Sequence, residues 1–221
     1  MIQEFYIINK VIIWFIVKIL LAYLINRNSI NTIMKISIVN GSVRKGRQSH
    51  KVAGYVESTL NNRNIACDLI DLAQAPLPIM GFEPDQTTGT DEQINDISNR
   101  LAESDAVILV TPEYHGSFSG VLKNALDHFT PEFVKKPVGV VAASAGKMAG
   151  INASTQLQHV ILSLGAYPVP QKLLVPEVHN ALDDSIEPQN EVIRKSTNRF
   201  LDEFIWFAEA IVQKKVQEEA V

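Results

Sequence analysis

The sequence predicts a doubly wound α/β fold, in which helices cover both faces of a parallel sheet of five strands. Short apolar runs rich in β-branched residues alternate with longer segments whose apolar residues recur at helical spacing. One run, Ala106 to Val110, contains no polar residue, which is typical of a strand buried on both faces of a parallel sheet. Repeated strand and helix units require crossover connections, and these are right-handed between parallel strands.

Strands and helices alternate in the first half of this region. Lys35 to Val39 is a β-branched strand, and the segment Gln48 to Leu60 that follows it has the apolar spacing of a helix. Ile65 to Ile70 is the second strand, which ends at Asp71 and is followed by a long, proline-containing loop. Asp91 to Ala102 is expected to be helical because its isoleucine and leucine side chains fall on one face.

The same alternation continues to the end of the chain. After the apolar third strand, the apolar residues from Val121 to Leu126 recur at helical spacing. Pro137 to Ala142 and Tyr167 to Leu174 are the fourth and fifth strands, and Ile151 to Leu164 is the helix between them. Val192 to Val212 is an amphipathic helix that closes the domain.

The first 33 residues differ in composition from the rest, since they contain no glycine, proline or aspartate. Their apolar run from Val11 to Ile25 is 15 residues long, whereas a helix that spans a bilayer needs about 20. The run also lacks the basic flank and cleavage site of a signal peptide. We therefore expect residues 1–33 to lie outside the functional domain, residues 34–221 to form that domain, and Met34 to be its natural start. A membrane-associated helix and a helix packed on the domain are the alternatives for residues 1–33.

Charge and cysteine content exclude several classes of protein. With 20 basic and 24 acidic residues, the chain has a formal charge of −4 and lacks the basic excess typical of nucleic-acid binding. The single cysteine, Cys67, is expected in a buried strand, so neither a disulfide framework nor a multi-cysteine metal site is available. We expect a cytoplasmic protein with no metal site and with no membrane contact, unless residues 1–33 provide one.

A phosphate-binding loop is expected between the first strand and the first helix. In doubly wound sheets, ligands bind outside the carboxyl ends of the strands, near the point where the strand order reverses. The loop from Asn40 to His50 combines glycine with the hydroxyls of Ser42 and Ser49 and the guanidinium of Arg44, and it leads into a helix N-terminus. An ordinary capped turn is the alternative. The loop matches neither the G-x-x-x-x-G-K-[ST] pattern nor the G-x-G-x-x-G pattern.

The loop after the third strand, with the helix that follows it, carries a more specific pattern. From Pro112 to Asp127 the sequence reads P-E-Y-H-G-x-x-S-G-V-L-K-N-A-L-D. This string strongly resembles the flavin-edge loop and helix of the NADPH-dependent FMN reductase family, which includes azobenzene, quinone and chromate reductases. The G-S-x-R of the first loop and the glycine-containing loop from Ala143 to Gly150 are similar to the corresponding loops of that family. The resemblance extends from Met34 to Val175 and implies a flavodoxin-like fold with the strand order 2-1-3-4-5.

The resemblance also implies which residues bind FMN. The first loop would bind the phosphate, the second would line the isoalloxazine, with Tyr114 stacking on it, and the third would lie along its pyrimidine side. The residues are Ser42, Arg44, Gln48, Ser49 and His50 in the first loop, Pro112, Glu113, Tyr114, His115 and Gly116 in the second, and Ser144, Ala145, Gly146 and Lys147 in the third. His115 stands where many members of the family have asparagine.

The chemistry implied by the resemblance needs no catalytic side chain, because the flavin N5 carries the hydride. His115 is the one side chain left open as a contributor. NADPH or NADH would reduce FMN, leave, and be replaced by a small acceptor such as a quinone, an azo compound, free flavin or a metal oxyanion, which is a ping-pong scheme. A homodimer or homotetramer is expected.

Two alternatives from other classes stay open. An electron-carrier flavodoxin would use the same fold, although the arginine in the phosphate loop argues against it, since flavodoxins use a loop of hydroxyl residues and glycine there. A non-enzymatic FMN-binding regulator is the other alternative.

Overall fold

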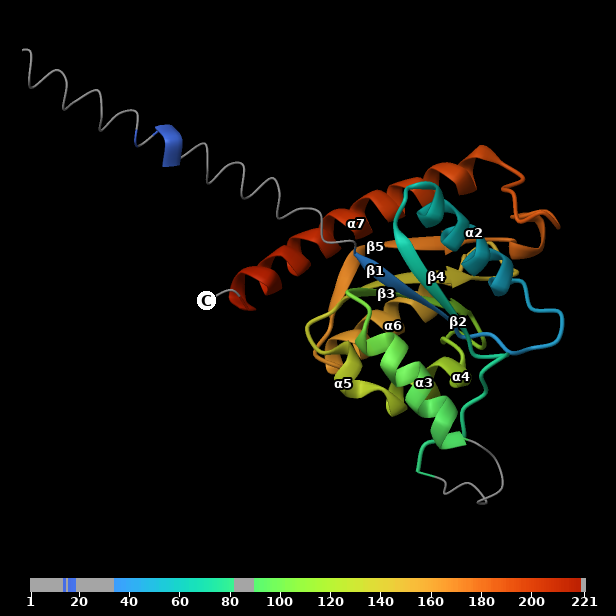
Figure 1. The fold of residues 1–221 in the computed structure, drawn as a ribbon. Coiled ribbons are helices and arrows are strands. Elements are labelled where there is room, and N and C mark those ends of the chain that lie inside the picture. Colours follow the sequence, from blue (N-terminus) through green and yellow to red (C-terminus); the bar gives the residue numbers. More distant parts are fainter. Residues whose placement is uncertain (1–13, 15, 19–33, 82–89, 220–221) are drawn as a thin grey trace, which may run out of the picture. The chain divides into compact units, whose positions relative to one another are not determined.

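The computed structural model describes Trp14 and residues 16–18, 34–81 and 90–219 (Figure 1). Its contacts divide the chain into two units, Met1–Ile33 and Met34–Val221. In the first unit, Trp14 and residues 16–18 are helical, and the Lys18 ammonium lies 4.3 Å from the centre of the Trp14 ring. The rest of the predicted apolar run from Val11 to Ile25 lies outside the described residues. In the described parts of the chain, no helix has both the length and the apolar character needed to cross a membrane.

Five parallel strands form the sheet of the second unit, in the order β2-β1-β3-β4-β5 (Figure 1). Their bounds are β1 (Lys35–Asn40), β2 (Ala66–Asp71), β3 (Ala106–Pro112), β4 (Pro137–Ala143) and β5 (Tyr167–Val175). All neighbouring pairs in the sheet are parallel. The strand order reverses at the β1–β3 pair, so the crevice expected of this topology lies between the loops that follow these two strands.

Helices lie on both faces of the sheet (Figure 1). The bounds are α2 (Ser49–Asn62), α3 (Thr90–Ala102), α4 (Gly120–His128), α5 (Thr130–Phe133), α6 (Ile151–Ser163), η1 (Val178–Asn180) and α7 (Glu191–Glu219). One buried cluster joins α2 and α7 to the sheet, and a second joins α3, α4, α5 and α6 to the opposite face. Because side chains alternate along a strand, Ile36 and Ile38 of β1 belong to the first cluster and Val39 to the second.

Helix α7 packs closely on the sheet because Gly139 of β4 has no side chain. A Cβ at this position would lie 2.8 Å from Phe204 Cδ2 and 2.9 Å from Phe200 Cζ. Both phenylalanine rings are fully buried, and their centroids are 5.9 Å apart. A side chain at position 139 would therefore push α7 away from β4.

The predicted fold class and strand order are confirmed, and the predicted elements differ from those observed mainly at their ends. The short elements α5 and η1 carry no sequence signal, because they do not complete a repeat of the helical spacing. The burial expected for Cys67 is wrong. The residue lies in β2 but is only partly buried, because β2 is an edge strand, and burial still raises the pKa of its thiol to about 11.

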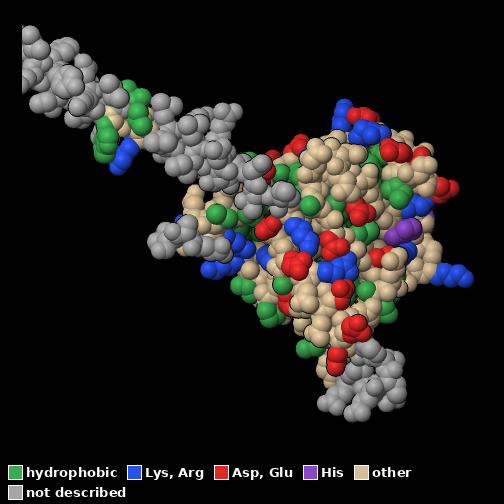
Figure 2. Space-filling model, in the orientation of Figure 1, with side chains coloured by type: hydrophobic (Ala, Val, Ile, Leu, Met, Phe, Trp, Pro, Cys, Tyr) green, Lys and Arg blue, Asp and Glu red, His purple; other side chains and the backbone are tan. Residues whose placement is uncertain are grey.

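The described surface carries mixed charge. On the face in Figure 2, Lys and Arg side chains lie among Asp and Glu side chains, and no extended area has a single charge. Within the described residues, no group of three or more His, Cys, Asp and Glu side chains is placed to hold a metal ion.

Candidate functional site

Three loops meet at the carboxyl ends of β1, β3 and β4 and enclose a cleft of about 300 Å³. A fourth segment, the connection between β5 and α7, adds to its wall. The lining residues are Ser42, Arg44, Lys45, Gly46, Arg47, Gln48, Ser49, Pro112, Glu113, Tyr114, Ala143, Ser144, Ala145, Val178 and His179. The position is the one that the strand order predicts for a ligand.

One end of the cleft lies at the start of a helix. Helix α2 begins there, and its N-cap residue Gln48 makes no side-chain cap, which leaves the first backbone N–H groups of the helix available. The first helical residue, Ser49, is buried, and its Oγ has no hydrogen-bond partner within the described residues. Ser42 is also buried beside it in the cleft wall. An uncapped helix and an unpaired buried hydroxyl are what a bound phosphate group would satisfy.

Arg47 holds this loop in shape. Its guanidinium forms a bidentate pair with Asp71, with both N–O distances 2.5 Å, and also donates to the Ser42 carbonyl. Burial alone would raise the pKa of the Asp71 carboxyl, but hydrogen bonds from Arg47, the Ala73 N–H and Asn40 lower it overall. Burial, together with the Arg47 charge, lowers the pKa of the neighbouring His50. The guanidinium of Arg47 therefore stabilises the loop through these contacts.

Two other cations of the same loop are free to meet a ligand. Arg44 and Lys45 are exposed at the cleft, and neither side chain has a hydrogen bond or ion pair within the described part of the chain. Because Arg47 is neutralised by Asp71, the net positive charge at this end of the cleft comes from Arg44 and Lys45. A guanidinium can contact a phosphate through two parallel hydrogen bonds.

Gly41 has a packing role that differs from the expected one. The sequence suggests that glycine here lets a ligand approach, but a Cβ on Gly41 would lie 2.6 Å from Cβ of Leu122. The glycine therefore allows the loop to pack against α4. Ser119 completes this contact, because its Oγ donates to the Gly41 carbonyl and accepts from the Leu122 N–H at the start of α4.

Glu113 binds the next helix. Its Oε2 accepts hydrogen bonds of 3.1 Å from the backbone N–H groups of Asn152 and Ala153 in the first turn of α6. The N-cap residue of α6 is Gly150, which has no side chain to cap the helix. The carboxylate therefore replaces the missing cap and is favoured by the positive end of the helix dipole.

The tip of the β3–α4 loop is a tight turn. Tyr114 and Ser117 exchange two backbone hydrogen bonds, of 2.8 and 3.0 Å, and the two residues between them have positive φ, +51° for His115 and +76° for Gly116. Two successive positive φ values define a type I′ turn, in which Asn-Gly is the preferred pair. His115 stands at the first of these two positions, where the turn prefers asparagine. Gln156 of α6 holds the turn through the Gly116 carbonyl.

The loop after β4 is tied to the end of the sheet. The Ser144 N–H donates to the Val175 carbonyl, and the Ser144 carbonyl accepts from the Val178 N–H. The N–O distance is 3.0 Å in both hydrogen bonds. Its Oγ accepts from the Gly146 N–H. The loop returns to α6 through Gly150, where φ is +80° and a Cβ would lie 2.8 Å from Ala142 Cβ, so only glycine fits.

Nine of the fourteen predicted residues line the cleft, from all three loops. They are Ser42, Arg44, Gln48, Ser49, Pro112, Glu113, Tyr114, Ser144 and Ala145. The remaining five do not line it: His50 lies inside α2, His115 and Gly116 form the turn tip, and Gly146 and Lys147 lie on the outer, exposed part of their loop. The sequence misses Lys45, Gly46, Arg47, Ala143, Val178 and His179. Lys45, Gly46 and Arg47 had a usable signal, since they lie inside the predicted loop from Asn40 to His50, whereas His179 had none.

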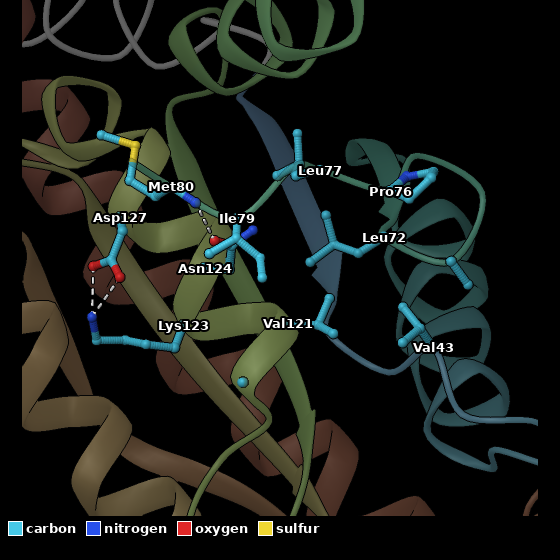
Figure 3. Close-up of a pocket in the computed structure, with 12 residues that line it drawn as sticks. Val43, Leu72, Pro76, Leu77, Ile79, Met80, Val121, Lys123, Asn124 and Asp127 are labelled. Atoms are coloured by element: carbon cyan, nitrogen blue, oxygen red, sulfur yellow. Dashed lines mark hydrogen bonds and ion pairs between the residues drawn. The ribbon is translucent and has the colours of Figure 1, made fainter. Parts of the chain in front are cut away.

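A second, larger hollow lies beside the cleft, between the loop after β1, the loop after β2 and α4 (Figure 3). Its volume is about 770 Å³, and its lining is mainly apolar, with Val43, Leu72 and Val121 coming from the three elements. Asn124 joins α4 to the second of these loops, because its Nδ2 donates to the Pro78 carbonyl and its Oδ1 accepts from the Met80 N–H. The rim also carries the Lys123–Asp127 ion pair shown in Figure 3.

The fold, with a cleft at the carboxyl ends of β1, β3 and β4, defines a class, that of flavodoxin-like domains. Within this class, the chain belongs to the NADPH-dependent FMN reductase family, whose model matches residues 34–180.

Curated relatives agree with this assignment. The chain is 32% identical to an FMN-dependent NADPH-azoreductase of Staphylococcus haemolyticus over 183 residues, which cover 79% of this chain and 95% of the relative. It is 35% identical to an enzyme of the same name from Staphylococcus aureus over 147 residues, which cover 63% of this chain and 76% of the relative.

Solved structures show the same fold. FerB of Paracoccus denitrificans, a flavoenzyme NAD(P)H:(acceptor) oxidoreductase, is 25% identical with a TM-score of 0.68, and the match covers 80% of this chain and 98% of FerB. A flavodoxin from the domain Archaea is 12% identical with a TM-score of 0.52, and the match covers 80% of this chain and 99% of the flavodoxin. At this identity the likeness shows the fold alone. The predicted family and enzyme class, an NAD(P)H-dependent FMN reductase with FMN and NADPH as cofactors, are therefore confirmed.

Proposed function

We propose that the cleft binds FMN and that residues 34–221 use NADPH to reduce small aromatic acceptors of the azo or quinone kind. The observation that carries the proposal is an uncapped helix N-terminus beside a buried Ser49 hydroxyl and the Arg44 guanidinium, neither of which has a partner within the described residues. They lie at the edge of the sheet where this fold binds ligands. The azo acceptor is supported by the names of the relatives, which are azoreductases. NADPH as donor and a single cysteine fit the reducing cytoplasm.

The residues of the cleft fit the parts of FMN. Ser42, Ser49, Arg44 and the first N–H groups of α2 would hold the phosphate. Gln48 would assist from the loop and His50 from the first turn of α2. Tyr114 would stack on the isoalloxazine, and Pro112, Glu113, His115 and Gly116 would contribute mainly backbone groups. Ser144, Ala145, Gly146 and Lys147 would lie along the pyrimidine side. When bound, FMN supplies a ring that accepts hydride from NADPH and passes two electrons to the acceptor.

The protein itself contributes the binding of the cofactor and the space in which the donor and the acceptor meet it. The sequence carries no second glycine-rich nucleotide-binding pattern, so nicotinamide and acceptor would use the same space beside the cofactor in turn. Glu113 is engaged with α6 and Arg47 with Asp71, so we assign no proton transfer to either.

The experiment that tests the proposal is anaerobic mixing of the FMN-loaded protein with NADPH. We expect the flavin absorbance to bleach, and to recover when an azo dye or a quinone is added. In the steady state, double-reciprocal plots at several fixed acceptor concentrations should be parallel. No bleaching would indicate a flavodoxin or a non-enzymatic binding protein, and intersecting lines would contradict the shared space.

Replacing His115 with asparagine should change the choice of acceptor more than the reduction of the flavin. Asparagine keeps the positive φ of the type I′ turn, so only the side chain at the rim of the site changes. We expect kcat/KM for acceptors to change, while the anaerobic rate of flavin reduction stays within about threefold, less than 1 kcal/mol. Stopped-flow measurement of both half-reactions checks this. A collapse of the reductive half-reaction would place His115 in the chemistry.

We propose that the protein is a homodimer or homotetramer, and that the apolar rim of the larger hollow contributes to the contact. Ile79 and Met80 on this rim are 71% and 53% exposed, which is high for large apolar side chains. Replacing Ile79 with aspartate is expected to lower the mass measured by size-exclusion chromatography with light scattering. Val192 is 70% exposed and lies at the start of α7, so Val192→Asp is the matched control. An unchanged mass for Ile79→Asp would contradict the role of this rim.

We also propose that residues 34–221 suffice for activity. The family model begins its match at residue 34, and the sheet and the cleft lie in the unit Met34–Val221. A protein that starts at Met34 is expected to bind FMN and to reduce acceptors at the rate of the full chain. Loss of FMN binding in the shortened protein alone would show that residues 1–33 are structural.

A further inference from the structure

His179 is a cleft residue to which the binding scheme above gives no role. It belongs to η1, in the connection between β5 and α7, and lines the cleft together with Val178. Its side chain is exposed at the cleft and makes no hydrogen bond within the described residues. An imidazole in this position has an N–H group available for a ligand.

The backbone that carries His179 is held at two places. On one side, the Val178 N–H donates to the Ser144 carbonyl at 3.0 Å, in the loop after β4. On the other side, the ammonium of Lys51 in α2 lies 2.8 Å from the Asp184 carboxylate and donates to the Asp183 carbonyl. These contacts attach the connection to the loop after β4 before His179 and to α2 after it.

The backbone contact next to His179 indicates which end of the cleft this residue faces. The connection begins after β5, the edge strand that lies beside β4. Its contact in the cleft wall is Ser144, in the loop proposed to lie along the pyrimidine side of the flavin. The phosphate end already has its own donors, in α2, Ser49 and Arg44.

We propose that His179 is a cofactor-binding residue, and that its imidazole N–H donates to the pyrimidine side of the isoalloxazine. This inference rests on the proposed binding of FMN in the cleft. The pyrimidine side presents carbonyl oxygens and ring nitrogens that can accept such a bond. A donor there stabilises the bound cofactor, and stabilises it more when two added electrons increase the charge on the ring.

The test is a titration of the FMN-free protein with FMN and with riboflavin, followed by flavin fluorescence. His179→Ala is expected to raise the Kd of both ligands by about three- to tenfold, which corresponds to one hydrogen bond. His179→Gln keeps an N–H donor, so its Kd should lie closer to that of the wild type. The reduction potential of bound FMN should become more negative in His179→Ala and change less in His179→Gln.

Asn180→Ala is the matched control, because Asn180 is the next residue of η1, is also exposed and does not line the cleft. Its Kd should equal that of the wild type, and all the FMN-free variants should unfold at the same temperature. Equal FMN affinity in wild type and His179→Ala would overturn the inference. It would also be overturned if Asn180→Ala lost as much FMN affinity as His179→Ala. A loss for FMN without one for riboflavin would place His179 at the phosphate and also overturn it. Failure of the wild type to bind FMN would overturn the proposed function itself.

Discussion

Arg44→Ala is expected to weaken FMN binding by about 10- to 150-fold, while riboflavin affinity stays unchanged. Arg44 is exposed at the anion end of the cleft and has no partner within the described residues, so its removal costs the fold little. A hydrogen bond to a charged group contributes about 1.5–3 kcal/mol, which gives the expected change in Kd. Riboflavin lacks the phosphate, so its affinity should be the same for the wild type and for Arg44→Ala.

Two further variants sharpen this experiment. Arg44→Lys keeps the charge but loses the two parallel hydrogen bonds, so it should fall between wild type and alanine. Arg194→Ala removes an exposed cation of α7 and changes the net charge equally, so it controls for long-range attraction. Equal losses for FMN and riboflavin in Arg44→Ala would mean that this arginine supports the fold of the loop.

Arg47→Ala is expected to lower the free energy of unfolding by about 3 kcal/mol, because it leaves a buried carboxylate without its partner. The side chains of Arg47 and Asp71 are only 17% and 10% exposed, and the pair closes the loop after β1 against the end of β2. FMN affinity should fall as well, since Arg47 also holds the Ser42 carbonyl. Urea denaturation, followed by circular dichroism, measures the loss.

Strand β2 offers a matched control. Asp68 of the same strand forms a second bidentate pair, with Arg100, in which the side chains are 27% and 29% exposed. Arg100→Ala should cost less stability, because solvent screens the pair more, and it should leave FMN affinity unchanged. If both variants lose FMN to the same degree, the effect on binding is a general loss of stability.

The stability difference between wild type and Arg47→Ala should depend on pH in the acid range. The pKa of Asp71 is lowered in the folded protein, so the pair contributes stability above the unfolded pKa of about 3.9 and loses it as the pH falls through the folded value. In Arg47→Ala, the pKa of Asp71 should lie above its value in the wild type, because the hydrogen bonds and charge of Arg47 are lost, and the variant should be less impaired at acid pH. A difference that stays constant from neutral pH to about pH 3 would show that the Asp71 charge is not its source.

Local patterns in the sequence were sufficient for the elements of the fold. Apolar spacing reports which face of a segment is buried, so Gln48 to Leu60 was recognisable as a helix and Ala106 to Val110 as an interior strand. The ends of the helices were less certain. Helix α7 continues to Glu219 because the residues after Val212 are mostly strong helix formers, which lack the apolar spacing that marks a buried face.

The sequence by itself determined the doubly wound fold class and the three loops of the site, because each depends on residues near one another in the chain. Its resemblance to the NADPH-dependent FMN reductase family supplied most of the nine predicted residues that line the cleft. Only the tertiary structure decided which charges are free. Arg44 and Arg47 differ by three positions in one loop, yet Arg47 is paired with Asp71, 24 residues away, and Arg44 is not paired within the described chain. Likewise, Gly41 lets Leu122 pack against the loop after β1, and His179 lines the cleft from the connection that follows β5. Such contacts depend on how distant segments pack together, and no spacing within a single segment encodes them.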